Sequence, residues 1–111
     1  MRFQETMVAG SATHHQQPGV GELVIGAADG DGRAWEELVA GFSGLVSSIT
    51  EAHRLSDAEA TRVRAMVWRR LGHNLGKIRQ PDRIGTWVAA VARDECVKVL
   101  TYGRMAAQPA A

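Results

Sequence analysis

Apolar residues recur at helical intervals in three long stretches of the chain. In residues 33–50 the apolar side chains are spaced three or four positions apart. They are Trp35, Leu38, Phe42, Leu45, Val46 and Ile49. Positions three and four apart share one face of an α-helix, so this spacing predicts an amphipathic helix. Asp31 stands just before it, where a carboxylate can accept hydrogen bonds from the free amides of the first turn.

A second amphipathic helix is predicted to follow Ser56. Ser56 and Glu59 have the spacing of a capping box, in which each side chain accepts a hydrogen bond from the other residue's backbone amide. The apolar face of this helix consists of Ala60, Val63, Val67, Leu71 and Leu75. Arg62, Arg69 and His73 are predicted on the opposite face.

Pro81 prevents this helix from continuing into the next one. A last helix is expected from residue 82 or 83 to about Leu100, with Asp94 and Lys98 as an exposed i,i+4 ion pair. Its buried stripe consists of Ile84, Val88, Val91, Ala92, Cys96 and Val99. The chain is expected to fray after Leu100.

Residues 22–28 predict a further short helix, and no stretch alternates polar and apolar residues in the manner of a strand. We therefore expect an all-α fold, a compact bundle of three main helices plus a short N-terminal helix, over residues 22–104. Residues 1–21 and 105–111 lack helical periodicity, so we expect a flexible leader and a flexible tail there.

The net charge of +1 is too small for an obligate nucleic-acid coat protein. The distribution of charge is more informative than the sum. Between Arg62 and Lys77 every ionised side chain is basic, and a basic turn with Arg79 and Arg83 follows. The acids gather elsewhere, at Asp29, Asp31, Glu36 and Glu37. The sequence therefore predicts one strongly positive region on a nearly neutral protein.

The sequence offers no residue set for catalysis, metal binding or a cofactor. Its acids lie on separate predicted helices without a partnered histidine, and His14 and His15 have no further ligands nearby. The single cysteine, Cys96, excludes an internal disulfide in a monomer and favours a cytoplasmic setting. No apolar run approaches the roughly 20 residues of a membrane span, and the N-terminus lacks the features of a secretory signal.

Four short stretches resemble, in their order and spacing, the second conserved region of bacterial sigma factors of the extracytoplasmic-function group. They are GDGRAWEELV at residues 30–39, LSDAEA at 55–60, VWRRL at 67–71 and IGTWVAAVARDECVKVL at 84–100. The most specific feature is Trp87, followed five positions later by Ala92 and Arg93. The resemblance covers residues 22–104.

The resemblance implies a helical domain that docks on the clamp coiled coil of core RNA polymerase and binds the minus-ten promoter element as a single strand. In the family, the loop before the last helix captures a flipped base. Here that loop is the basic turn, where cations would neutralise phosphates and Ile78 and Gln80 would line the base pocket. The implied DNA-binding residues are Lys77, Arg79, Gln80, Arg83, Trp87, Arg93, Asp94 and Lys98.

Some of these residues have a plainer explanation. An aromatic residue at the start of an amphipathic helix, such as Trp87, is more often part of the core than a contact to a base. Arg93 and Lys98 are equally well explained as solvated surface.

The chain departs from the family on the polymerase-binding helix. The family commonly has Asp and Gln where this sequence has Arg62 and Ala65, and like charges brought together across an interface disfavour docking. Asp94 stands where the family often has a polar residue that contacts a base. The predicted polymerase-binding or partner-binding residues are Arg62, Ala65, Met66 and Arg69. The family's second domain, which binds the minus-thirty-five element, has no counterpart in these residues, so we expect either an excised domain or a protein without that half.

Three interpretations stay open. The first is a sigma-factor domain for transcription initiation. The second is a stand-alone sigma-like module that binds a regulator, or another face of polymerase, through its altered docking surface; the resemblance also allows an anti-sigma factor as a partner. The third is a small helical domain whose basic face is only solvated surface. No enzymatic activity is expected.

Overall fold

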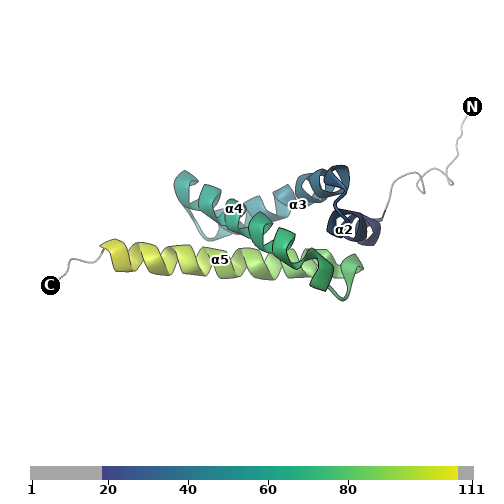
Figure 1. Cartoon of the computed structure of the whole chain (residues 1–111). Helices are drawn as coiled ribbons and strands as arrows, with labels where there is room; N and C mark the ends of the chain where they lie inside the picture. The colour runs from purple at the N-terminus through teal and green to yellow at the C-terminus, as the bar shows by residue number, and fades with distance from the viewer. Residues whose placement is uncertain (1–18, 108–111) are drawn as a thin grey trace, which may run out of the picture.

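The computed structural model describes residues 19–107, and within this range the protein is helical without any strand (Figure 1). The expected all-α fold is therefore confirmed. The α-helices are α2 (Val20–Ala28), α3 (Gly32–Ala52), α4 (Asp57–Asn74) and α5 (Ile84–Ala107). Two short 3₁₀ helices, η1 (Leu75–Lys77) and η2 (Pro81–Arg83), form the connection between α4 and α5.

Both predicted helix caps are present. Asp31 Oδ1 accepts hydrogen bonds from the backbone amides of Arg33 and Ala34 at 3.0 and 3.3 Å. Ser56 Oγ accepts from the Glu59 amide at 3.1 Å, and Glu59 Oε1 accepts from the Ser56 amide at 2.8 Å. These bonds satisfy amides that have no partner within the helix, and they fix where α3 and α4 begin.

The last helix is longer than expected, because α5 continues to Ala107 instead of fraying after Leu100. No proline occurs between these two residues, and Gly103 weakens a helix by only about 1 kcal/mol. At the other end, α2 already begins at Val20, inside the expected leader. The rest of that leader, with His14 and His15, lies outside the described residues, as does the end of the expected tail.

The apolar faces of the four helices meet in one core. All six residues predicted for the buried stripe of α5 are buried. They pack with buried side chains of the other helices, chiefly Val24, Leu38, Val46, Ile49, Val63, Val67 and Leu71. The partly buried aromatics Trp35, Phe42, Trp68 and Trp87 pack against this cluster. Fully burying a side chain of Val or Leu size contributes about 1.5–3 kcal/mol.

Helix α2 packs against α3 and also against both 3₁₀ helices of the α4–α5 connection. Gly21 makes this contact close, because a Cβ atom at this position would overlap the Asp82 side chain. The short helix therefore supports the turn that contains the basic residues. None of the helices in residues 19–107 is both long enough and apolar enough to cross a membrane.

Candidate nucleic-acid interface

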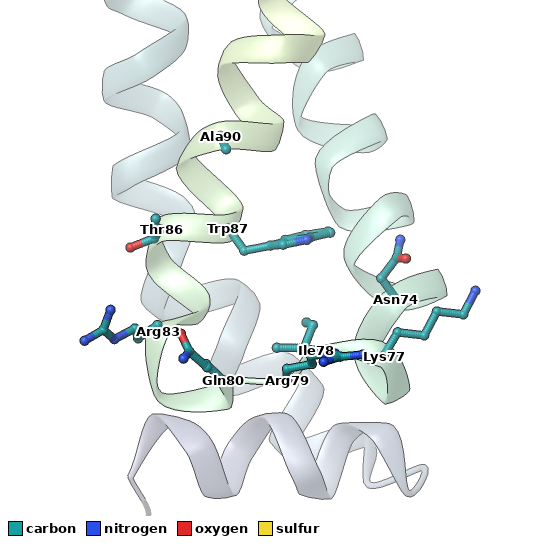
Figure 2. Close-up of a pocket in the computed structure, with 9 residues that line it drawn as sticks. All are labelled: Asn74, Lys77, Ile78, Arg79, Gln80, Arg83, Thr86, Trp87 and Ala90. Atoms are coloured by element: carbon teal, nitrogen blue, oxygen red, sulfur yellow. The ribbon is translucent and has the colours of Figure 1, made fainter.

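A pocket of about 580 Å³ opens where α4 ends and α5 begins (Figure 2). It lies beside the basic turn predicted from the sequence. Its lining residues are Asn74, Lys77, Ile78, Arg79, Gln80, Arg83, Thr86, Trp87 and Ala90. The structure therefore brings together five of the eight predicted DNA-binding residues, together with Ile78.

Trp87 forms the aromatic wall of the pocket. Its indole reaches from α5 toward the end of α4, across the space above Ile78 (Figure 2). The same side chain is partly buried and packs against the core cluster. Trp87 therefore lies at the edge of the core, and its indole also lines the pocket.

The three cations of the turn are exposed. Figure 2 shows Lys77 and Arg83 extending from opposite sides of the pocket, with Arg79 between them. Among the described residues, none of the three forms an ion pair with an acid. The acid of the turn, Asp82, lies against Gly21 of α2. The cations are therefore available to a ligand.

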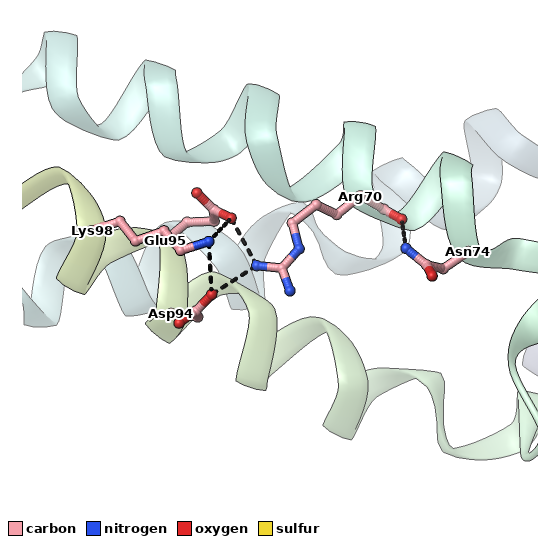
Figure 3. Close-up of polar contacts among 5 residues, drawn as sticks. All are labelled: Arg70, Asn74, Asp94, Glu95 and Lys98. Atoms are coloured by element: carbon pink, nitrogen blue, oxygen red, sulfur yellow. Dashed lines mark hydrogen bonds and ion pairs between the residues drawn. The ribbon is translucent and has the colours of Figure 1, made fainter.

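Four charged side chains form a network farther along the same two helices (Figure 3). Arg70 Nη1 of α4 donates hydrogen bonds to Asp94 Oδ2 at 2.8 Å and to Glu95 Oε2 at 2.7 Å. Lys98 Nζ lies 3.3 Å from Asp94 Oδ2, which confirms the predicted i,i+4 pair, and 3.5 Å from Glu95 Oε2. Two positive and two negative charges therefore balance within the protein.

The network affects the pKa of its members. The hydrogen bond from Arg70 holds the pKa of the Asp94 carboxyl below its usual value, with a smaller contribution from Lys98. The bonds to Glu95 and then Asp94 raise the pKa of Arg70. Asp94 and Lys98, two of the predicted DNA-binding residues, thus have partners inside the protein and do not line the pocket. Arg93, the third outlying residue, is exposed on α5.

The predicted partner-binding residues lie on another part of α4. Arg62, Ala65 and Arg69 are exposed, whereas Met66 is half-buried. Arg62 also lines a shallow hollow of about 140 Å³ with Glu59 of the same helix. This surface is separate from the pocket beside the turn.

Sequence reasoning missed three residues of this region, namely Arg70, Asn74 and Glu95. Glu95 is 4% exposed, and its spacing from the predicted core residues Val91 and Val99 could have indicated burial. Asn74 lines the pocket and donates from Nδ2 to the Arg70 carbonyl oxygen at 2.7 Å. The Arg70–Glu95 contact joins α4 to α5 and is seen only in the folded arrangement, whereas the Asn74 bond lies within α4.

No metal site is found among the described side chains, since no three His, Cys, Asp or Glu residues gather there. Cys96 is fully buried, and burial raises the pKa of its thiol. A buried thiol with a raised pKa stays mostly protonated, and the reactive form of cysteine is the thiolate. The cysteine is a core residue, as predicted.

Comparison of the chain with models of protein families, with curated proteins and with solved structures finds no significant match. The resemblance to sigma factors therefore stays a hypothesis that depends on the four sequence stretches.

Proposed function

We propose that this protein is a sigma-like domain that binds single-stranded minus-ten promoter DNA in the pocket beside the basic turn. The observation that supports this function best is the combination of the Trp87 wall with three exposed cations that form no ion pair with a described acid. An aromatic surface and neighbouring cations are the two features with which proteins bind unpaired nucleic acid.

The two features contribute in different ways. Stacking of a base on an aromatic side chain contributes about 1–3 kcal/mol and is similar for all bases. Lys77, Arg79 and Arg83 neutralise phosphates, which releases counterions and makes affinity depend on salt. A base in a duplex is stacked and paired, and removing it costs a few kcal/mol, so the pocket favours DNA that is already single-stranded.

The sigma-like part of the proposal depends on the four sequence stretches and on the order of the helices. In this proposal α4 docks on the clamp coiled coil of core RNA polymerase through its exposed face at Arg62, Ala65 and Arg69. A domain with these partners acts in transcription initiation, in the cytoplasm.

The proposed binding of single-stranded DNA is tested by fluorescence anisotropy. One promoter sequence is used in two labelled forms, as a single strand and as the matching duplex. We expect the single strand to bind more tightly, and the affinity to fall as salt is raised. Equal affinity for both forms, or no binding at low salt, would contradict the proposal.

A second function, a sigma-like module that docks on a regulator, is favoured by one observation. Arg62 is exposed on α4 at a position where the family commonly has a carboxylate. A binding assay with purified core polymerase separates the two functions. If the protein docks as sigma factors do, the wild type binds core polymerase and Arg62→Asp binds it more tightly. If neither protein binds polymerase but both still bind single-stranded DNA, the regulator function is favoured.

A further inference from the structure

The acid of the basic turn lies on the other side of the turn from the pocket. Of residues 77–83, only Pro81 and Asp82 do not line the pocket. Asp82 instead lies against Gly21 of α2, and no residue of α2 lines the pocket. In Figure 2 the helix α2 passes below the turn, whereas the Trp87 indole lies above it. The turn therefore separates its acid from its cations.

Gly21 leaves the space in which the Asp82 carboxylate lies. Gly21 is buried in the first turn of α2, and a Cβ atom at this position would overlap Asp82 Oδ1. The backbone nitrogen of Asp82 would lie 3.6 Å from the same Cβ, which is an ordinary van der Waals contact. An added methyl group would therefore displace the carboxylate and leave the backbone of the turn in place.

The carboxylate has cations nearby, yet it is not paired with them. Arg83 follows Asp82 in the chain, and Arg79 precedes it by three positions. Among residues 19–107, however, Asp82 forms no ion pair. The first turn of α2 is a favourable place for it, because the first amides of a helix lack partners within the helix and the helix dipole favours negative charge there. Displaced from α2, the carboxylate would be free to pair with the two arginines that line the pocket.

We propose that Gly21 is a positioning residue for the DNA site: by leaving room for the Asp82 carboxylate beside α2, it keeps Arg79 and Arg83 free for phosphates. This inference depends on the proposed binding of single-stranded DNA. It deepens that function, because it gives α2, which lies outside the pocket, a part in the binding of the strand.

The test is a double-mutant cycle of Gly21→Ala and Asp82→Asn, measured by anisotropy with a labelled single-stranded thymidine oligonucleotide. Gly21→Ala should weaken binding about two- to fivefold, as one exposed ion pair predicts. It should also lower the slope of log affinity against log salt by about 0.7, because one phosphate contact is lost. Adding Asp82→Asn should restore both quantities, since asparagine has the shape of aspartate without the charge. In the wild type, Asp82→Asn should change the affinity less.

The matched control is Gly76→Ala. Gly76 lies in η1 of the same connection, is exposed, and has no atom within 4 Å of an added Cβ. This variant should keep the wild-type affinity and the wild-type slope. Circular dichroism and urea denaturation show whether each variant is folded. A purely structural role, in which alanine at position 21 only loosens α2, would lower the affinity equally with and without Asp82→Asn.

The outcomes separate this inference from the function on which it depends. An equal effect of Asp82→Asn in the wild type and in Gly21→Ala would overturn the role of Gly21 and leave single-strand binding intact. Gly21→Ala that binds as the wild type does, or that does not fold because the carboxylate cannot move aside, would overturn it as well. No binding of the oligonucleotide by the wild type at low salt would overturn the proposed function itself.

Discussion

Trp87 belongs to the core and to the pocket at once. It packs against the buried cluster, and its indole forms the wall between the basic turn and α4. A residue in this position couples the ligand site to the packing of α5. Removing the ring should therefore weaken both binding and stability, whereas a smaller ring should separate the two effects.

Replacing Trp87 with Ala should weaken single-stranded DNA binding by about 1–3 kcal/mol, because the stacking surface is lost. Trp87→Phe keeps an aromatic face and should retain most of the affinity. Anisotropy titrations measure both variants, with circular dichroism to show that they are folded. Equal losses for Ala and Phe would contradict stacking as the source of the affinity.

Glu95 is an acid in the core, and Arg70 is its closest cation at 2.7 Å. Burying an unpaired charge is unfavourable, and breaking a fully buried pair typically costs about 3–5 kcal/mol. Arg70 is partly exposed and Lys98 stays within 3.5 Å of the carboxylate. The loss of Arg70 should therefore cost less than that range.

We expect Arg70→Met to lower the free energy of unfolding by about 1–3 kcal/mol, as measured by urea denaturation. Arg93→Met, which removes an exposed arginine of α5, is the control and should change little. Adding Glu95→Leu to Arg70→Met should restore much of the stability. A double variant as unstable as Arg70→Met alone would show that the buried charge is not the cause.

The lowered pKa of the Asp94 carboxyl predicts that the protein loses stability in acid. Its pKa in the folded protein lies below the usual 3.8, chiefly because of the hydrogen bond from Arg70. The unfolded chain therefore takes up this proton first, so the stabilisation is complete above about pH 5 and is lost as the pH falls through the folded-state pKa. Urea midpoints measured across this range should fall more steeply for the wild type than for Asp94→Asn. Parallel curves would contradict the contribution of Asp94.

The helices themselves were predictable because their signals are local. Residues three and four apart define the apolar faces, and Ser56, Asp31 and Pro81 mark where helices begin or are interrupted. The helix α5 continues beyond the predicted end near Leu100, because Thr101, Tyr102 and Gly103 are weak helix formers that do not interrupt a helix already formed. The pairing of Arg70 with Asp94 and Glu95 was not predictable from periodicity, since it joins two helices across 24 and 25 positions.

Two glycines test how α3 and α5 pack. Gly41 of α3 is exposed and has no neighbour within 4 Å of an added Cβ, whereas a Cβ at Gly85 of α5 would lie 3.2 Å from Phe42 Cε1. Gly41→Ala should raise the free energy of unfolding by about 0.5–1 kcal/mol, through helix propensity alone. Gly85→Ala should give no such gain. Equal stabilisation in urea denaturation would show that Phe42 does not pack on Gly85.

Across the whole molecule, a net charge of +1 conceals a separation of charge. The network of Arg70, Asp94, Glu95 and Lys98 is balanced internally, whereas the turn at the end of the bundle keeps its cations exposed. The sequence predicted the basic turn and the pocket residues in it, because they are consecutive. The resemblance to sigma factors implied that Asp94 and Lys98 belong to the same site, whereas the fold shows that Arg70 pairs with Asp94.

The salt dependence of single-stranded DNA binding tests the central claim, that the cations of the turn contact the strand. Two double variants that each remove two positive charges are compared with the wild type. The turn variant combines Arg79→Gln with Arg83→Gln, and the α4 variant combines Arg62→Gln with Arg69→Gln, away from the pocket. We expect the slope of log affinity against log salt to decrease by about 0.7 for each lost phosphate contact in the turn variant. The α4 variant should keep the wild-type slope. Identical slopes for the turn variant and the wild type would contradict the account.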